Sequence, residues 1–178
     1  RWGRSWPRLA TLSNEREEIT NPQFRLSYDL QVSLPGKSQK VTLSDMRNLQ
    51  SLTMTVYRVN CRGDFNESPD TKNGYEKIEP LLDGVVYEQK REYTGHQPYE
   101  EFEDSLTLEG LPVGVYLVEL RSNPSTKIVR HLYHVTDVYT IAEDQPNHEG
   151  VRYVVVNATT GQPIAGAQLR IWDYTTYA

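Results

Sequence analysis

The chain has 178 residues, with 19 basic and 24 acidic side chains, a net charge of −5 and a pI near 5.4. No block of lysine and arginine is long enough to follow a phosphate backbone, so nucleic acid is excluded as an expected partner. The apolar runs are far shorter than the roughly 18 residues that a membrane-spanning helix needs. The length accommodates one large domain or two small ones, because domains commonly contain roughly 100 to 150 residues.

The beginning of the chain differs in character from the rest. Residues 1–20 contain Trp2, Trp6 and the charged run 14–18 without a sustained hydrophobic period, and we interpret them as a connector or a short docked helix. Apolar residues then alternate with polar ones at positions 24, 26, 28, 30 and 32. This period of two predicts a half-buried strand over residues 24–32.

Further segments of strand type follow, separated by turn-forming residues. They cover residues 52–59, 85–93, 102–108, 113–120 and 127–135, with no convincing amphipathic helix between them. The loop over residues 61–74 is rich in Asp, Asn, Ser, Pro and Gly, and we expect it to be exposed. The pattern predicts an all-β fold, with an antiparallel immunoglobulin-like β-sandwich over residues 21–136.

A tyrosine follows the turn at residues 110–114. Gly110, Pro112 and Gly114 are expected to turn the chain between sheets, and Tyr116 lies near the start of the next strand. Greek-key sandwiches often place a tyrosine there whose hydroxyl holds the crossing loop. We therefore expect the Tyr116 hydroxyl to bind the loop.

A second unit is predicted after Val135, because a new strand begins almost without a linker. Residues 151–172 indicate strand, turn and strand, with the turn at 157–161 and Pro163 at an edge or a strand start. The small residues 165–167 are expected to allow close backbone approach before a strand resumes at 168–171. Residues 137–178 are too few for a sandwich of roughly 100 residues, so they predict the start of a second, incomplete sandwich.

Histidine and cysteine give no metal or nucleophile signal. His131 and His134 are three apart on a predicted strand and therefore face opposite sides, while His96 and His148 are isolated. Cys61 is the single cysteine, which excludes an internal disulfide and favours a strand-end cysteine over a reactive thiol.

Acidic residues offer two further candidates. The group Glu100, Glu101, Glu103 and Asp104 is compatible with calcium binding or paired acids, but its alternation around Phe102 favours a solvated strand face. The oxygen-bearing residues 64, 66, 68 and 70 imitate a calcium loop, in which Pro69 and Tyr75 occupy the positions that require Gly and Glu. That match therefore fails.

Two short motifs remain open in meaning. Arg62-Gly63-Asp64 is a tripeptide that some integrins bind, and chance explains it well. Asn157-Ala158-Thr159 is a glycosylation acceptor pattern, relevant only in a eukaryotic secretory pathway. The sequence assigns no catalytic, cofactor-binding or metal-binding residue, and we expect a protein that is not an enzyme.

The order of several motifs resembles a known family. Leu-Glu-Gly-Leu-Pro-Val-Gly-Val-Tyr at 108–116, Val-Thr-Asp-Val at 135–138 and Thr-Gly-Gln-Pro-Ile-Ala-Gly-Ala at 160–167 look like the macroglobulin domains of large bacterial alpha-2-macroglobulin-like proteins. The step at 47–49, which leads into the strand 52–59, is similar to the opening strand region of that family. The last of the three elements also occurs in carboxypeptidase-regulatory-like and adhesin sandwiches.

The resemblance implies a secreted or periplasmic, often lipid-anchored protein that is cleaved in a bait region and traps a protease, sometimes through a thioester. That thioester pairs a Cys with a Gln three residues later, whereas Asp64 stands three residues after Cys61. Because the chain begins with Arg1 rather than Met, we expect a fragment of a longer precursor that supplies scaffold. Its expected partners are other domains of the same polypeptide and, through the full-length protein, a target protease.

An alternative function belongs to another class. An adhesin-like or carbohydrate-binding sandwich would use surface tyrosines, and the chain has 12 tyrosines in all. Tyr93, Tyr99, Tyr174 and Tyr177 lie in polar contexts suited to stacking on sugars.

Overall fold

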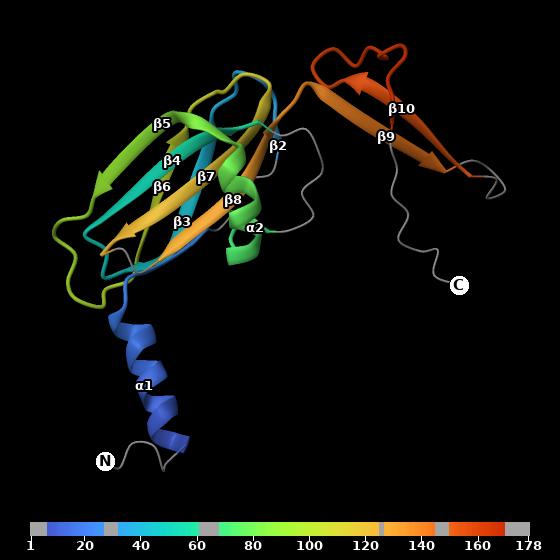
Figure 1. Ribbon diagram of the computed structural model, residues 1–178. Coiled ribbons are helices and arrows are strands. Elements are labelled where there is room, and N and C mark those ends of the chain that lie inside the picture. Colours follow the sequence, from blue (N-terminus) through green and yellow to red (C-terminus); the bar gives the residue numbers. More distant parts are fainter. Residues whose placement is uncertain (1–6, 27–31, 61–67, 125–126, 145–149, 170–178) are drawn as a thin grey trace. The chain divides into compact units, whose positions relative to one another are not determined.

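The computed structural model describes residues 7–26, 32–60, 68–124, 127–144 and 150–169 (Figure 1). The chain divides into two compact units, Arg1–Val135 and Thr136–Ala178. Strand β8 of the first unit ends at Val135 and strand β9 of the second begins at Val138. The two units are therefore joined almost without a linker.

The first unit consists of two β-sheets. The three-stranded sheet has the order β1-β3-β6, with β1 at Gln23–Leu26, β3 at Gln39–Arg47 and β6 at Phe102–Leu108. The five-stranded sheet has the order β2-β8-β7-β4-β5, with β2 at Val32–Ser33, β8 at Ile128–Val135, β7 at Gly114–Asn123, β4 at Ser51–Val59 and β5 at Leu82–Glu92. All neighbours pair antiparallel except the short β2, which runs parallel to β8. The predicted all-β, antiparallel sandwich class is confirmed.

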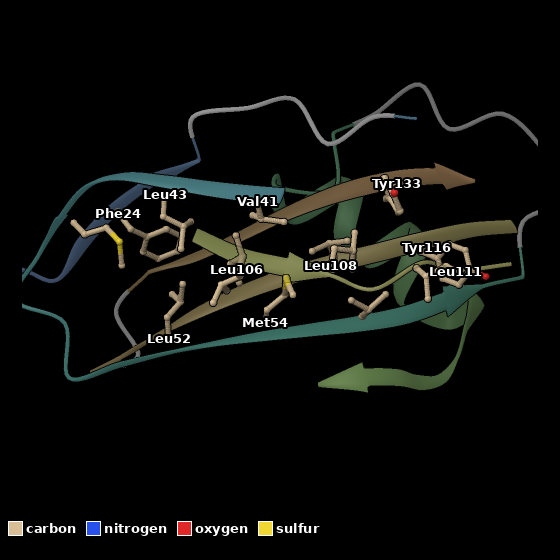
Figure 2. Close-up of a cluster of buried hydrophobic side chains, with 14 of the residues drawn as sticks. Phe24, Val41, Leu43, Leu52, Met54, Leu106, Leu108, Leu111, Tyr116 and Tyr133 are labelled. Atoms are coloured by element: carbon tan, nitrogen blue, oxygen red, sulfur yellow. The ribbon is translucent and has the colours of Figure 1, made fainter. Parts of the chain in front are cut away.

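The hydrophobic core lies between these two sheets (Figure 2). Every second residue along a strand contributes to it, as the period of two predicts. The five-stranded sheet supplies Leu52, Met54, Val56, Tyr116, Val118, Leu120, Tyr133 and Val135, and the other sheet supplies Phe24, Val41, Leu43, Met46, Leu106 and Leu108. Each large side chain buried there stabilises the fold by about 1.5 to 3 kcal/mol.

Strand β3 was absent from the sequence-based prediction. Its buried residues Val41, Leu43 and Met46 are all 0% exposed, but the spacing between them changes from two to three. The pairing register of β3 with β6 shifts between Leu43 and Met46, and Asp45 there has a positive φ of 51°. A β-bulge inserts one residue and so interrupts the alternation on which the prediction depends.

The single strand predicted over residues 24–32 is wrong in its extent. Strand β1 ends at Leu26 in one sheet and β2 begins at Val32 in the other, so the chain changes sheets between them. The alternating positions 28 and 30, which suggested one continuous strand, lie outside the described residues.

The described part of the first unit also contains two helices. A helix was one of the two interpretations of residues 1–20, whereas the second helix was not predicted. Helix α1 spans Pro7–Thr20, helix α2 spans Lys72–Ile78 within and beyond the predicted loop, and a 3₁₀ turn follows at Glu79–Leu81. Residues 11–20 of α1 are all exposed, which explains why the sequence shows no buried stripe there. The Asn48 side-chain amide donates to the Ile19 carbonyl at 2.7 Å and so ties the end of α1 to the sandwich.

The predicted role of Tyr116 is confirmed. Its side chain is 0% exposed, and its hydroxyl donates a hydrogen bond of 2.8 Å to the Pro112 carbonyl. Gly110 has a separate role, because a Cβ at this position would overlap the backbone of Gly36. The Gly36 amide in turn donates to the Leu111 carbonyl at 3.0 Å, so two turns are held together beside the core.

In the second unit, β9 (Val138–Asp144) and β10 (Val151–Asn157) form an antiparallel two-stranded sheet. The turn predicted after β10 is present, since the Asn157 side-chain oxygen accepts from the backbone amides of Thr159 and Thr160. Pro163 makes an isolated bridge with Val156, as expected for a residue at an edge.

The prediction for the end of this unit is partly wrong. Gln168 and Leu169 are not in a strand, and residues 170 and 171 lie outside the described part of the chain. Gly166 has no atom within 4 Å of the place of a Cβ and has a φ of +72°. A turn with positive φ, and not close backbone approach, explains this glycine.

Replacing Tyr116 with Phe tests the loop anchor. We expect the Tyr116→Phe variant to lose about 1 kcal/mol of unfolding free energy, because the Pro112 carbonyl loses its donor. The measurement is urea unfolding followed by far-UV circular dichroism. Tyr99→Phe is the matched control, since Tyr99 is 56% exposed, and equal losses in both variants would contradict the anchor.

Candidate functional site

Three of the four histidines lie in the described part of the chain, and His148 lies outside it. On β8, His131 is half-buried and His134 is exposed. His96 stacks on the Phe102 ring, with 3.8 Å between the ring centroids and 8° between the planes. Within the described ranges, no three His, Cys, Asp or Glu side chains form a group suited to a metal ion.

The acidic residues Glu100, Glu101 and Asp104 contact different partners. Glu101 pairs with Arg47 at 3.0 Å, and the Glu100 carboxylate accepts from the Gln97 amide at 2.7 Å. Asp104 accepts from the Tyr93 hydroxyl at 3.0 Å and lies 3.3 Å from Arg91 Nε. The solvated face expected for this group is wrong for Asp104, whose side chain is only 25% exposed.

The other sequence candidates lie only partly within the described residues. Cys61, the Arg62-Gly63-Asp64 tripeptide and residues 64 and 66 of the imitation calcium loop lie outside the described residues. Asp70 is described, and its carboxylate accepts from the backbone amide of Arg130 at 2.9 Å. The Asn157 amide group makes its contacts within its own turn and with Asp137 at 3.4 Å.

The structure assembles a charged site that the sequence did not predict, on the face of the five-stranded sheet away from the core. Here Arg130, Glu119, Thr55 and Glu88 lie directly opposite one another on β8, β7, β4 and β5. We call Glu119, Arg121, Arg130 and Tyr75 the Glu119 cluster. It is bordered by an apolar group of Val59, Ile78 and Leu117 that packs α2 against the sheet.

Helix α2 reaches this position through local interactions. The Thr71 side chain caps it by accepting from the Gly74 amide at 3.1 Å, and the same hydroxyl donates to the Ser68 carbonyl at 2.8 Å. A Cβ at Gly74 would overlap that carbonyl, so only glycine allows this tight start. The helix then buries Ile78, which is 0% exposed, and carries Tyr75 to the cluster.

Glu119 is the centre of the cluster. Its side chain is 5% exposed, and its two carboxylate oxygens accept separately from Arg121 at 2.8 Å and from Arg130 Nε at 2.7 Å. The Arg130 guanidinium also lies 3.7 Å from the centre of the Tyr75 ring, a cation–π distance. Arg130 therefore connects α2, β7 and β8 in one place.

The nearby phenols are kept neutral. Burial, and next the negative charge of Glu119, raises the pKa of Tyr57 above its ordinary value. Burial, followed by the charge of Glu79, likewise raises the pKa of Tyr75. Guanidinium groups hold both oxygens of Glu119, and the two phenols keep their protons. Tyr75 of α2 packs on Arg130, which binds Glu119, so the cluster fixes α2 on the sheet. We assign it this positioning role.

A signal for this cluster was present in the sequence. Glu119 interrupts the apolar run Val115 to Leu120 in a strand that was predicted correctly. A charged residue in a central strand is almost never buried without a partner. The partners Arg130 and Tyr75 come from distant segments, and pairing across the sheet cannot be derived from spacing along the chain.

A polar hollow of about 320 Å³ lies at the C-terminal end of β4. It is lined by Arg58, Val59, Asn60, Asp83, Gly114 and Val115. Among the described residues that line it, the polar side chains are Arg58, Asn60 and Asp83.

No protein-family model matches the chain, and no curated protein matches it. Neither of the helices described has the length and apolar character of a membrane-spanning segment. The fold and the geometry above are thus the observations on which a function can be proposed.

Removing the charge of Glu119 should cost far more than removing that of Arg121. We expect Glu119→Gln to lower the unfolding free energy by about 3 kcal/mol, because Arg130, with a side chain only 15% exposed, is left without a counter-charge. Arg121→Gln should cost less than about 1 kcal/mol, since that side chain is 47% exposed. Urea unfolding of both variants measures the difference, and similar losses would refute the central position of Glu119.

Tyr93 provides a test that depends on pH. Burial, then the hydrogen bond to Asp104, raises its pKa far above the ordinary value of 10.0. The unfolded chain loses this proton first, so the stability contributed by Tyr93 is present below pH 10 and declines as the pH rises above it. At pH 8, Tyr93→Phe should cost about 1 kcal/mol.

The stability difference between wild type and Tyr93→Phe should then narrow between pH 10 and pH 11. Urea midpoints at pH 8, 9, 10 and 11 provide the measurement, with Tyr99→Phe as the control. A difference that stays constant or widens would contradict the raised pKa.

Proposed function

We propose that this chain is a non-catalytic scaffold and interaction module of a larger alpha-2-macroglobulin-like protein that traps or inhibits proteases. The first unit would be a macroglobulin-type, immunoglobulin-like sandwich, and the second unit the start of another. Two observations on the first unit support this. The Tyr116 anchor belongs to the motif at 108–116 that carries the resemblance, and the sandwich connects directly into new β-structure at Val138.

The main support comes from the exposed apolar residues of the second unit. Val138, Tyr139, Ile141, Val151 and Tyr153 on β9 and β10 are between 39% and 61% exposed. A two-stranded sheet is marginally stable by itself, and exposed apolar patches of this kind mark interaction sites. A module that packs against further domains of its own polypeptide explains this surface.

The proposed role is mechanical and not chemical. A thioester trap needs a Gln three residues after its Cys, and Asp64 stands there after Cys61. Within a protease trap this chain would therefore hold other domains in position and form contacts between them. Such a protein acts outside the cytoplasm, in the periplasm or at the cell surface, and a lipid anchor at its N-terminus fits this proposal.

The adhesin-like alternative receives less support. Of the tyrosines proposed to stack on sugars, Tyr93 packs on Phe102 and donates its hydroxyl to Asp104. Tyr99 remains exposed, while Tyr174 and Tyr177 lie outside the described residues. A sugar-binding platform needs open aromatic faces, and Tyr93 does not provide one.

A capture experiment with the intact protein that contains this chain tests the proposed function. After incubation with proteases of several specificities, an entrapped protease should lose activity on a large protein substrate and keep it on a short peptide. The control is the same protease with its active site blocked, which cannot cleave a bait region and should remain free. Free migration of every active protease, with full activity on the large substrate, would refute the proposal.

A further inference from the structure

Strand β5 presents a long free edge at the end of the five-stranded sheet (Figure 1). Among the described residues it pairs with β4 alone. All of its residues from Leu82 to Glu92 are exposed or half-buried. The backbone N–H and C=O groups on its outer side are consequently open for pairing with another strand.

The two halves of this edge differ in regularity. From Leu82 to Val86 the register with β4 shifts twice, and Gly84 has a φ of +74°. From Tyr87 to Glu92 the pairing advances one residue at a time against β4. Only this second half has the regular, extended backbone that a further strand needs.

The charges of the regular half cancel, and those on the face away from the core alternate in sign. Glu88 and Lys90 lie on the face away from the core, where Glu88 accepts from Thr55 at 3.3 Å. Arg91 lies on the core side, 3.3 Å from Asp104 of β6. With Glu92, the segment contains two acidic and two basic residues.

Symmetry restricts how this edge can pair with its own copy. A two-fold axis relates two antiparallel edge strands only if it runs perpendicular to the sheet, and it then keeps each side chain on its own face. A residue that lies a given number of positions before the axis faces the residue of the second copy that lies the same number of positions after it. Each register is therefore defined by the one residue at the axis, which faces the same residue of the second copy.

Within the regular half, the charges select one register. An axis at Glu88, Lys90 or Glu92 sets that charge against itself, which is destabilising, and an axis at Tyr87 draws in the irregular half. An axis at Arg91 pairs Lys90 with Glu92, but it sets Arg91 against itself and leaves only residues 90–92 of the strand in the pairing, because β5 ends at Glu92. An axis at Gln89 pairs Glu88 with Lys90 of the second copy, twice by symmetry. It also places Tyr87 opposite Arg91, a favourable cation–aromatic pair.

We propose that β5 is a homodimerisation edge, which pairs antiparallel with β5 of a second copy about a two-fold axis at Gln89 and joins the two five-stranded sheets into one. The Lys90–Glu92 ion pair within the strand, at 2.6 Å, is exposed and exchanges for the Glu88–Lys90 pairs between copies. This inference does not depend on the proposed protease trap.

Charge exchange at positions 88 and 90 tests the proposal. Glu88→Lys places two lysines opposite each other at positions 88 and 90, and Lys90→Glu places two glutamates there. Each variant should therefore dimerise at least about tenfold more weakly than wild type. An equimolar mixture of the two variants restores opposite charges at every pair, as does the double variant. Both should regain wild-type dimerisation.

Sedimentation velocity of the 20.5 kDa chain, over concentrations up to about 0.5 mM, measures the association. The matched controls are Glu109→Lys and Lys37→Glu, which make the same charge changes at exposed positions away from β5. A wild-type chain that stays monomeric overturns the proposal and leaves the edge to a different partner. Dimerisation that ignores the changes at 88 and 90 places the interface elsewhere and overturns it as well.

A cross-link provides an independent measurement, should a charge variant fail to fold. Directly opposite residues of an antiparallel pair have Cα atoms about 4.5 to 5.5 Å apart, within reach of a disulfide. In a Cys61→Ser background, Gln89→Cys should therefore form a covalent dimer under mild oxidation. Thr107→Cys, exposed on β6, is the control and should remain monomeric, whereas equal cross-linking at both positions contradicts the register.

Discussion

The burial of strand β7 on both faces is the constraint on which the first unit depends. On one face Tyr116, Val118 and Leu120 enter the core between the two sheets. On the other face Leu117 and Glu119 lie beneath α2, exposed by no more than 4%. A strand covered on both sides tolerates a carboxylate only if its charge is compensated, and Arg130 and Arg121 meet that requirement. The sandwich, the position of α2 and the Glu119 cluster are thus consequences of the same burial.

Sequence patterns predicted those parts of the fold in which one simple period persists. Strand β6 was predicted with the bounds that it has, and β4, β7 and β8 within a few residues, because their apolar residues either alternate with polar ones or form a short apolar run. Strand β3 was not predicted, because the bulge at Asp45 changes the spacing of its buried residues. Helix α1 has no buried stripe to recognise, and α2 depends on the Thr71 cap and on packing against the sheet.

The charged site was less accessible to prediction than the fold. The acidic group at 100–104 is conspicuous in the sequence, but its members turn to separate partners, and only contacts across the sheets show that Asp104 is half-buried. Glu119 does not stand out in the sequence, although it is the centre of the cluster. The cluster also includes Arg130 of β8 and Tyr75 of α2, which are distant from Glu119 along the chain. Ionic sites assembled by register between strands leave little trace in the spacing of residues along one strand.

Two of the β-edges in the described part of the chain, β5 and the hairpin of β9 and β10, differ in chemistry. The hairpin of β9 and β10 exposes valine, isoleucine and tyrosine, which bind whatever apolar surface is available. The regular part of β5 exposes charges of both signs instead, and charges on an edge are a common protection against aggregation. Protection and recognition are compatible here, because a register centred on a charged residue sets that charge against its own copy, whereas the register centred on Gln89 pairs Glu88 with Lys90. An edge of this kind favours a single pairing register because charge repulsion destabilises the other registers. Such repulsion can provide specificity where the total affinity is small.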